Sequence, residues 1–298
     1  TPLSSYWLAD AFEKANFPKG VFNLVTGRGG EVGDAMATHP LINMISFTGS
    51  TSGGINVGKN ALTGLKHISL ELGGKSPYII LKGSNHEEAI RLCFNSIFLN
   101  SGQTCTAFSR LLIPKSEQSV IEKKLIEIAK EYTTGNPEDS STKLGPLASL
   151  RQYEKVKSYI ESGIQEGARL LYGTVPENSN NGYYISPTIF TCVTSEMSIA
   201  RDEIFGPVLC VFPYETEEEA IRIANDTRYG LNAGVYGEKE KAIAVAKKIE
   251  AGNIYINASP RDTSAPFGGY KQSGLGREGG IYGMIEFTQQ KALFDTGK

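Results

Sequence analysis

The chain has few cysteines and histidines, no long apolar run and no excess of one charge. Its four cysteines, Cys93, Cys105, Cys192 and Cys210, are scattered and form no CxxC pair. This argues against a disulfide scaffold and against a zinc site built from cysteine pairs. The three histidines are isolated from one another and from the cysteines, so we expect no metal site.

The formal net charge of −2 is spread without long runs of one sign. This is unlike a protein that binds nucleic acid or a membrane surface. No apolar stretch approaches the roughly 20 residues that span a bilayer, and no signal-peptide pattern opens the sequence. We therefore expect a cytoplasmic protein, with no nucleic-acid or membrane partner. The length of 298 residues is enough for about two domains.

Short apolar segments alternate with helix-like segments along the whole chain, which predicts an α/β protein with a parallel sheet. The tail predicts a short helix followed by a strand at QKALF (290–294), and PENSNNG (176–182) predicts a polar surface loop. Strands are predicted at VFNLV (21–25), MISF (44–47), HISLEL (67–72), YIIL (78–81), RLLIP (110–114), VLCVF (208–212), AGVY (233–236) and NIYI (253–256), and helices at 3–17, 31–38, 116–132, 147–166, 216–225 and 238–250.

Two glycine-bearing joints between a predicted strand and a helix are candidate phosphate sites. They are TGRGG (26–30) and FTGST (47–51), the latter with Gly49 and Ser50. Backbone N–H groups at a helix N-terminus and the helix dipole favour an anion there. Such a joint alone is usually an ordinary helix cap, and neither has the GxGxxG pattern, but two successive joints in one sheet favour a ligand site.

The stretches ELGGK (71–75) and NSGQTC (100–105) offer a carboxylate and a thiol in glycine-rich surroundings. Glu71 at a strand end is a candidate general base if burial raises its pKa, or else a partner of a cation such as Lys75. Cys105 is a candidate nucleophile among small residues, although no histidine partner is evident.

Two further stretches are unusual. In EIFGP (203–207), Glu203 is a candidate ligand of ribose hydroxyls and Phe205 a candidate support for a flat heterocycle, although the same loop is compatible with simple core packing. PFGGYKQSG (266–274) is dense in glycine, which suits either a loop lining a cleft or a tight connection between domains.

Taken together, ELGGK, NSGQTC, EIFGP and PFGGYKQSGLGRE, in this order and with FTGST before them, are similar to the motif series of the NAD(P)-dependent aldehyde dehydrogenase superfamily. The resemblance covers essentially the whole chain. It implies a Rossmann-like cofactor domain and an α/β catalytic domain. It also implies an enzyme that oxidises an aldehyde to a carboxylic acid with NAD or NADP.

The resemblance implies a role for each matching residue. Cys105 matches the nucleophile that forms a thiohemiacetal and then a thioester, and its N–H forms half of the oxyanion hole. Glu71 matches the base that activates water. The residues matching cofactor contacts are Gly49 and Ser50 at the pyrophosphate, Glu203 and Gln152 at the nicotinamide ribose, and Phe205 beside the nicotinamide.

Members of this family are usually much longer, and the chain resembles their C-terminal three-fifths. The expected missing parts are the first strands of the cofactor sheet, a lysine at the adenosine portion and the asparagine that completes the oxyanion hole. Loss of one oxyanion donor typically costs ~10²–10³ in rate. We therefore expect this chain alone to turn over little aldehyde.

The resemblance also divides the chain. It implies a partial dinucleotide-binding domain at 1–71, a catalytic domain at 72–272 and a C-terminal segment with an oligomerisation strand at 273–298. The longer form is then expected to be a homodimer or homotetramer. Two other readings stay open: a non-catalytic binding or assembly module of the same fold, and a thiol esterase that uses Cys105 and Glu71 without a cofactor.

Overall fold

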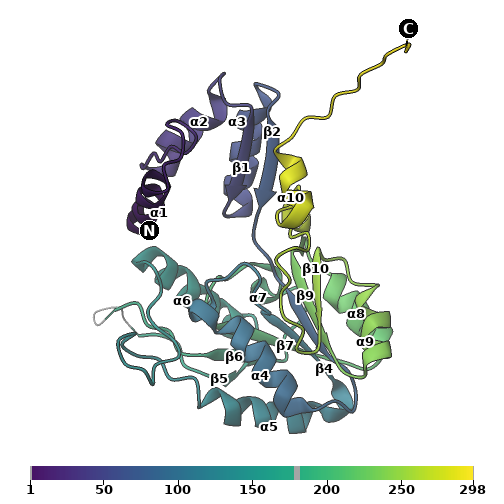
Figure 1. Cartoon of the computed structure of the whole chain (residues 1–298). Helices are drawn as coiled ribbons and strands as arrows, with labels where there is room; N and C mark the ends of the chain where they lie inside the picture. The colour runs from purple at the N-terminus through teal and green to yellow at the C-terminus, as the bar shows by residue number, and fades with distance from the viewer. Residues whose placement is uncertain (1, 178–181, 298) are drawn as a thin grey trace.

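The computed structural model describes residues 2–177 and 182–297, which form two units that each contain a sheet (Figure 1). The chain passes from the smaller unit to the larger one through Leu72–Ser76, between β2 and β3. The α/β class predicted from the sequence is confirmed. Of the surface loop predicted at 176–182, residues 178–181 lie outside the described residues.

The smaller unit is a three-stranded sheet in the order β1-β2-β12. Strands β1 (Met44–Thr48) and β2 (His67–Glu71) run parallel, joined by α3 (Thr51–Leu62). The short strand β12 (Gly274–Leu275) returns from the far end of the chain and pairs antiparallel with β2. The C-terminal region thus completes the sheet that ends at Glu71.

The N-terminal segment carries α1 (Pro2–Lys14), the π-helix η1 (Gly29–Gly33) and α2 (Asp34–Thr38). The strand predicted at 21–25 is wrong, because these residues lie in no strand. Val21 and Val25 are 62% and 68% exposed, and no sheet among the described residues includes this segment. A strand needs a neighbour to pair its backbone groups, and this segment has none.

The larger unit is a seven-stranded sheet in the order β10-β9-β3-β4-β7-β6-β5, parallel except for β5. Its central strands are buried on both faces, which explains their continuous apolar sequences. The strands are β3 (Pro77–Ile80), β4 (Arg110–Pro114), β5 (Arg169–Tyr172), β6 (Thr188–Thr191), β7 (Val208–Tyr214), β9 (Asn232–Tyr236) and β10 (Asn253–Ile256), and a separate two-stranded ribbon pairs β8 (Tyr229–Gly230) with β11 (Tyr270–Lys271).

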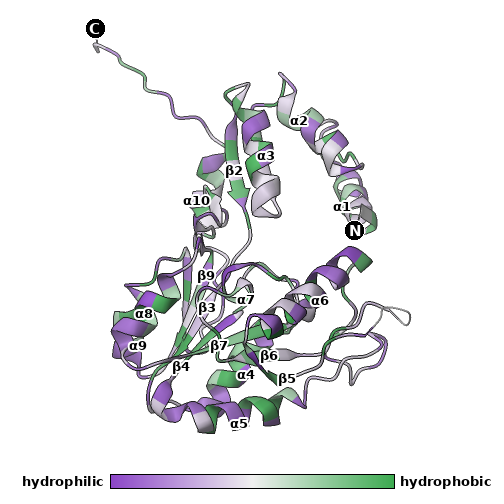
Figure 2. Ribbon diagram, turned by 180° about the vertical axis from the view of Figure 1, so that it is seen from behind, coloured by the Kyte–Doolittle hydropathy of each residue, from purple (hydrophilic) through white to green (hydrophobic). Residues whose placement is uncertain are grey.

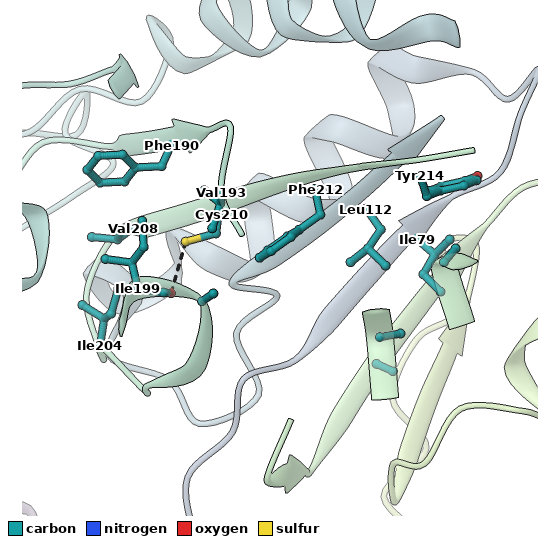
Figure 3. Packing of buried hydrophobic residues seen from close by; sticks show 14 of the residues in the cluster. Ile79, Leu112, Phe190, Val193, Ile199, Ile204, Val208, Cys210, Phe212 and Tyr214 are labelled. Atoms are coloured by element: carbon teal, nitrogen blue, oxygen red, sulfur yellow. Dashed lines mark hydrogen bonds between the residues drawn. The ribbon is translucent and has the colours of Figure 1, made fainter. Parts of the chain in front are cut away.

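Helices cover both faces of the seven-stranded sheet and create two apolar cores. One face packs on α4 and α5, and the other on α6, α7, α8 and α9. Figure 3 shows the second core, where Cys210 of β7 lies among apolar side chains and its thiol donates to the carbonyl of Ile199 at 3.2 Å. The helices are α4 (His86–Ile97), α5 (Gln118–Ala129), α6 (Leu150–Gln165), α7 (Ser198–Arg201), α8 (Glu217–Asn225), α9 (Lys239–Ala246) and α10 (Gly280–Glu286), with 3-10 turns η2 (Leu99–Gly102) and η3 (Lys115–Glu117).

The tail after α10 is extended and projects away from both units (Figure 1). The segment predicted as a strand, QKALF (290–294), forms none in this single chain, because no other strand lies beside it. Its Leu293 and Phe294 are among the most exposed apolar side chains, and apolar residues of α1 and α10 are exposed as well (Figure 2).

Candidate active site

Three segments from distant parts of the chain meet at one edge of the seven-stranded sheet. Strands β3, β4 and β7 are adjacent and parallel, so the residues that precede them lie at the same edge. These residues belong to ELGGK before β3, NSGQTC before β4 and EIFGP before β7. The structure thereby brings Glu71, Cys105 and Glu203 together, and both carboxylate charges act on the thiol of Cys105.

Glycines allow these segments to touch main chain to main chain. A Cβ on Gly73 would overlap the carboxylate of Glu203, and a Cβ on Gly74 would lie 2.6 Å from the carbonyl oxygen of Cys105. Side chains at these positions would separate the segments. The glycines of ELGGK are therefore required by close approach.

Cys105 lies in a tight turn that follows a strained stretch of backbone. Asn100 and Ser101 have φ values of 51° and 54°, a left-handed conformation that is rare for such residues and typical of functional sites. The Asn100 side chain donates to the carbonyl of Gln103 at 3.1 Å, which stabilises this backbone. Cys105 itself is half-buried at the end of the stretch.

The pKa of the Cys105 thiol is raised, first by burial and then by the negative charge of Glu203. The main-chain N–H groups of Cys105 and Thr106 act in the opposite direction and lower the pKa of this thiol. The thiol is thus neutral at rest and needs a base to become a nucleophile.

Glu71 ends β2 and is 4% exposed. Neither of its carboxylate oxygens has a hydrogen-bond partner among the described residues. The pKa of Glu71 is raised to about 8, chiefly by burial and next by the charge of Glu278, while Arg277 and Arg261 oppose the shift. A carboxyl group with such a pKa can exchange a proton near neutral pH, as a general base must.

Glu203 is held by two hydrogen bonds, one to its side chain and one to its main chain. Its Oε1 accepts the Gly74 amide at 3.1 Å, and its carbonyl accepts Lys155 Nζ at 2.9 Å. The pKa of Glu203 is raised by burial, against the lowering effect of that amide and of Lys155. Its carboxylate is fixed beside Gly73 and Cys105.

Gln152 and Phe205 are brought to the same loop. The Gln152 amide donates to the carbonyls of Ile204 and Phe205 at 3.0 and 2.8 Å. Phe205 has a φ of 61°, so these bonds support a backbone conformation that is rare for an aromatic residue. In this structure Gln152 braces the loop that carries Glu203.

Gly49 and Ser50 lie at the start of α3, in the smaller unit. Ser50 is the N-cap of α3, and its hydroxyl accepts the Gly53 amide at 3.2 Å. The Gly49 amide donates to the carbonyl of Glu71 at 3.0 Å, so this turn is joined to the strand end that carries Glu71. The helix N-terminus beside them is a suitable place for a phosphate.

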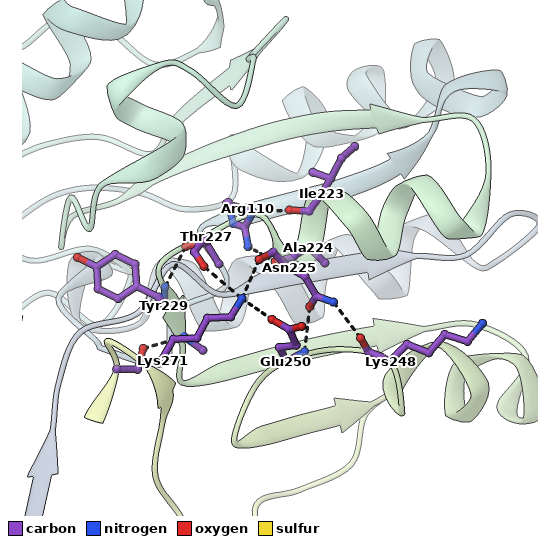
Figure 4. A network of polar contacts seen from close by, with 11 residues as sticks. Arg110, Ile223, Ala224, Asn225, Thr227, Tyr229, Lys248, Glu250 and Lys271 are labelled. Carbon is purple, nitrogen blue, oxygen red and sulfur yellow. Dashed lines mark hydrogen bonds and ion pairs between the residues drawn. The ribbon is translucent and has the colours of Figure 1, made fainter. Parts of the chain in front are cut away.

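The segment PFGGYKQSG (266–274) crosses from the larger unit to the smaller one and encloses Glu71. Ser273 is fully buried, and its hydroxyl donates to the carbonyl of Gly73 at 2.7 Å and accepts the Gly230 amide at 2.9 Å. Lys271 anchors the segment through Glu250 and the carbonyls of Asn225 and Thr227 (Figure 4).

The sequence interpretation missed several residues of this site. Ser273 and Glu278 lie within a stretch quoted for the resemblance, but no local pattern marks them. Lys75, which the sequence offered as a partner of Glu71, makes no bond to it: Lys75 is 1% exposed, its Nζ has no hydrogen-bond partner among the described residues, and burial lowers its pKa to about 8. Lys155 gave no signal in the sequence beyond its place on a helix.

No group of three or more His, Cys, Asp or Glu side chains in residues 2–177 and 182–297 could hold a metal ion. No helix in the same residues has the length and apolar character of a membrane span.

Comparison with known proteins gives a consistent result. The sequence model of the aldehyde dehydrogenase family matches residues 1–293. A 3-succinoylsemialdehyde-pyridine dehydrogenase of a Pseudomonas species is 48% identical over 295 residues, which are 98% of this chain and 62% of that protein.

Solved structures agree with the sequence match. Aldehyde dehydrogenase C of Pseudomonas syringae, a variant complexed with NAD+ and octanal, superimposes with a TM-score of 0.93 at 44% identity, over 96% of this chain and 60% of that one. Betaine aldehyde dehydrogenase of Staphylococcus aureus, in complex with NAD+, gives 0.92 at 39% identity, over 96% and 58%.

The chain belongs to the aldehyde dehydrogenase family. It spans about three-fifths of the length of the relatives that it matches.

Proposed function

We propose that the chain carries the nucleophile, the base and part of the cofactor site of an NAD(P)-dependent aldehyde dehydrogenase. The observation that carries the proposal is the convergence of Glu71, Cys105 and Glu203 at one sheet edge, with glycines at their contacts. The substrate class is an aldehyde. The relatives act on or bind different aldehydes by name, so the class is proposed without a particular member.

The Cys105 thiol is the attacking group. Glu71 accepts the thiol proton. Its carboxyl group has a pKa raised to about 8, close to the pH range in which a thiol loses its proton, so a proton can pass between the two groups. The sulfur then bonds to the aldehyde carbon, and the new oxyanion lies near the N–H of Cys105. That N–H is one donor of an oxyanion hole.

The second step, hydrolysis of the thioester, uses the same two residues, Cys105 and Glu71. After oxidation, the acyl group is a thioester on Cys105. Glu71 first releases the thiol proton to solvent. It then removes a proton from a water molecule that attacks the thioester, the C–S bond breaks, and the leaving thiolate takes that proton from Glu71, so that the products are the carboxylic acid and the free thiol. Burial of Glu71 without a hydrogen-bond partner in the described part of the chain keeps its carboxylate available for this water.

The residues present fit a dinucleotide. When bound, NAD(P)+ accepts a hydride from the thiohemiacetal carbon and so supplies the oxidation. Gly49 and Ser50 at the N-terminus of α3 would hold the pyrophosphate, and Glu203, fixed by the Gly74 amide, would accept ribose hydroxyls. Gln152 would lie at the nicotinamide ribose and Phe205 beside the nicotinamide. NAD+ in both solved relatives favours NAD+ over NADP+.

An acyl-enzyme experiment tests the proposal. In a form that contains this chain and oxidises aldehyde, we expect Glu71→Gln, incubated with aldehyde and NAD+ at alkaline pH, to accumulate an acyl group on the peptide that contains Cys105. At that pH the thiol ionises without its base, whereas hydrolysis of the thioester still lacks Glu71; at neutral pH acylation itself should be slow. Cys105→Ser should show no acylation and no NADH. Cys192→Ser, which removes an exposed thiol, is the matched control and should behave as the parent chain.

The control experiments define what would overturn the proposal. NADH formation that persists in Cys105→Ser would exclude Cys105 as the nucleophile. Acylation by an ester that is hydrolysed equally well without cofactor, together with no aldehyde oxidation in any form that contains this chain, would favour a thiol esterase instead.

The proposal extends to the domain organisation of the chain, its assembly with further copies and its location. We assign residues 1–71 to the cofactor domain, 72–272 to the catalytic domain and 273–298 to the C-terminal segment, since β2 and β3 belong to different sheets and β12 returns to the first. The exposed tail with Leu293 and Phe294 would pair with a second copy in a homodimer or homotetramer. Four free thiols fit the reducing cytoplasm.

A further inference from the structure

Asn232 reaches the turn that carries Cys105 from a strand outside the segments described above. It is the first residue of β9 and is buried. Its side-chain amide donates a hydrogen bond of 3.0 Å to the carbonyl oxygen of Thr106, the residue after Cys105. Nothing in the sequence around Asn232 marks this contact.

The turn itself has few other attachments. The Ala107 amide donates to the Thr104 carbonyl at 3.2 Å and closes the turn, with Cys105 and Thr106 at its corner. The carbonyl of Cys105 rests on Gly74. The next carbonyl, of Thr106, is the one that Asn232 holds. The corner is thus fixed by a steric contact with Gly74, ahead of β3, and by a hydrogen bond from β9.

The position of Asn232 is costly for the fold. Its amide oxygen is buried and has no hydrogen-bond partner in the described part of the chain, and the same is true of the hydroxyl of Ser76. A buried polar atom without a partner lowers the stability of the folded state. An apolar side chain would avoid this cost. The compensating interaction is the hydrogen bond from the Asn232 amide N–H to the Thr106 carbonyl.

The orientation of this turn matters for the thiol. The N–H groups of Cys105 and Thr106 are the groups that lower the pKa of Cys105 against burial and the charge of Glu203. They face the sulfur only while the turn keeps its orientation. A freely moving turn would lose part of this stabilisation of the thiolate.

We propose that Asn232 is a positioning residue for the nucleophile: by holding the Thr106 carbonyl it keeps the main-chain N–H groups of the turn directed at the Cys105 sulfur. This inference rests on the proposed role of Cys105. Asn232 acts through Thr106 and does not touch the reacting atoms.

The test is the rate at which iodoacetamide alkylates Cys105 between pH 6 and 10, followed on the peptide that contains it. Asn232→Leu keeps the branched shape of the side chain and cannot donate, although leucine is larger. We expect alkylation at neutral pH to slow by ~10-fold, with the midpoint of the profile moved up by about one pH unit. Cys192, an exposed thiol in the same molecule, is the internal control.

The matched control variant is Asn253→Leu. Asn253 lies directly opposite Asn232 on the neighbouring strand β10, and its amide nitrogen is also buried without a partner among the residues described, but it makes no bond to the turn. We expect N253L to keep the parent pH profile. Thermal melting of both variants measures any general loss of stability.

The outcomes are distinct. A profile of N232L that superimposes on those of the parent and N253L would overturn the inference, as would equal shifts in both variants. If N232L does not fold, the smaller Asn232→Ala, which also lacks a donor, gives the same reading. Because alkylation needs neither aldehyde nor cofactor, a failure of the proposed dehydrogenase activity would show separately, in the acyl-enzyme experiment.

Discussion

Gly102 and Gly206 lie main chain against main chain, so that a Cβ on Gly102 would overlap the carbonyl group of Gly206. This contact joins the segment that carries Cys105 to the segment that carries Glu203. Gly102 also has a φ of 77°, a conformation that residues with a side chain rarely adopt. Gly102 is therefore required for two independent reasons, the close approach of Gly206 and the positive φ.

The first prediction concerns this contact. We expect Gly102→Ala to lower the free energy of unfolding by ~2–4 kcal/mol, since strain and overlap with backbone act together. Urea titration measures the change. Gly58→Ala is the control: Gly58 lies inside α3 with open space around it, and alanine there should stabilise by about 1 kcal/mol. A neutral G102A would contradict the close approach.

The second prediction concerns the pH dependence of acyl-enzyme hydrolysis. An acetyl group placed on Cys105 should be hydrolysed faster as pH rises, with a midpoint near the Glu71 pKa of about 8. The charge of Glu278 raises this pKa and that of Arg261 lowers it. Glu278→Gln should therefore move the midpoint down and Arg261→Gln should move it up. Shifts in the same direction would refute this electrostatic account.

The third prediction concerns stability. The pKa of Glu71 in the folded chain lies above its ordinary value of 4.5, so the folded state holds a proton that the unfolded state releases. Its contribution to stability is complete below pH 4.5 and is lost as pH rises through about 8. Glu71→Gln should flatten the dependence of unfolding free energy on pH in this window, whereas the exposed Glu154→Gln should leave the slope as it is.

The fourth prediction concerns Ser273. Replacing it with alanine leaves the buried Gly73 carbonyl and Gly230 amide without their shared partner. We expect a loss of about 1–3 kcal/mol in unfolding free energy. Ser259→Ala is the control, because its exposed hydroxyl bonds the Ile256 carbonyl at 2.8 Å and its removal should change little. Similar losses of unfolding free energy in both variants would contradict a specific role of the Ser273 hydroxyl.

The sequence predicted five of the seven strands of the larger sheet, missed β5 and β6, and was wrong about a strand at 21–25. RLLIP and VLCVF are recognisable because strands buried on both faces are continuously apolar. VFNLV has the same composition and forms no strand, since pairing depends on neighbours that composition does not report. On α5, Val120 is 52% exposed while Ile121 next to it is buried, so apolar composition alone does not mark the buried face.

The candidate site was predictable as far as its motifs extend. Residues within ELGGK, NSGQTC and EIFGP converge because parallel strands place their leading segments at one edge. Ser273 and Asn232 were not predictable, because their meaning lies in bonds to Gly73 and Thr106, which are 200 and 126 residues away along the chain. No local pattern encodes such partners.

The passage of the chain through Leu72–Ser76 has a mechanical consequence. Glu71 ends a strand of the smaller sheet, whereas Cys105 precedes a strand of the larger one. The separation of base and sulfur is therefore set by the angle between two bodies, and neither body fixes it alone. A rotation of one unit against the other would change this separation, and the bonds of Ser273 to Gly73 and Gly230 oppose it.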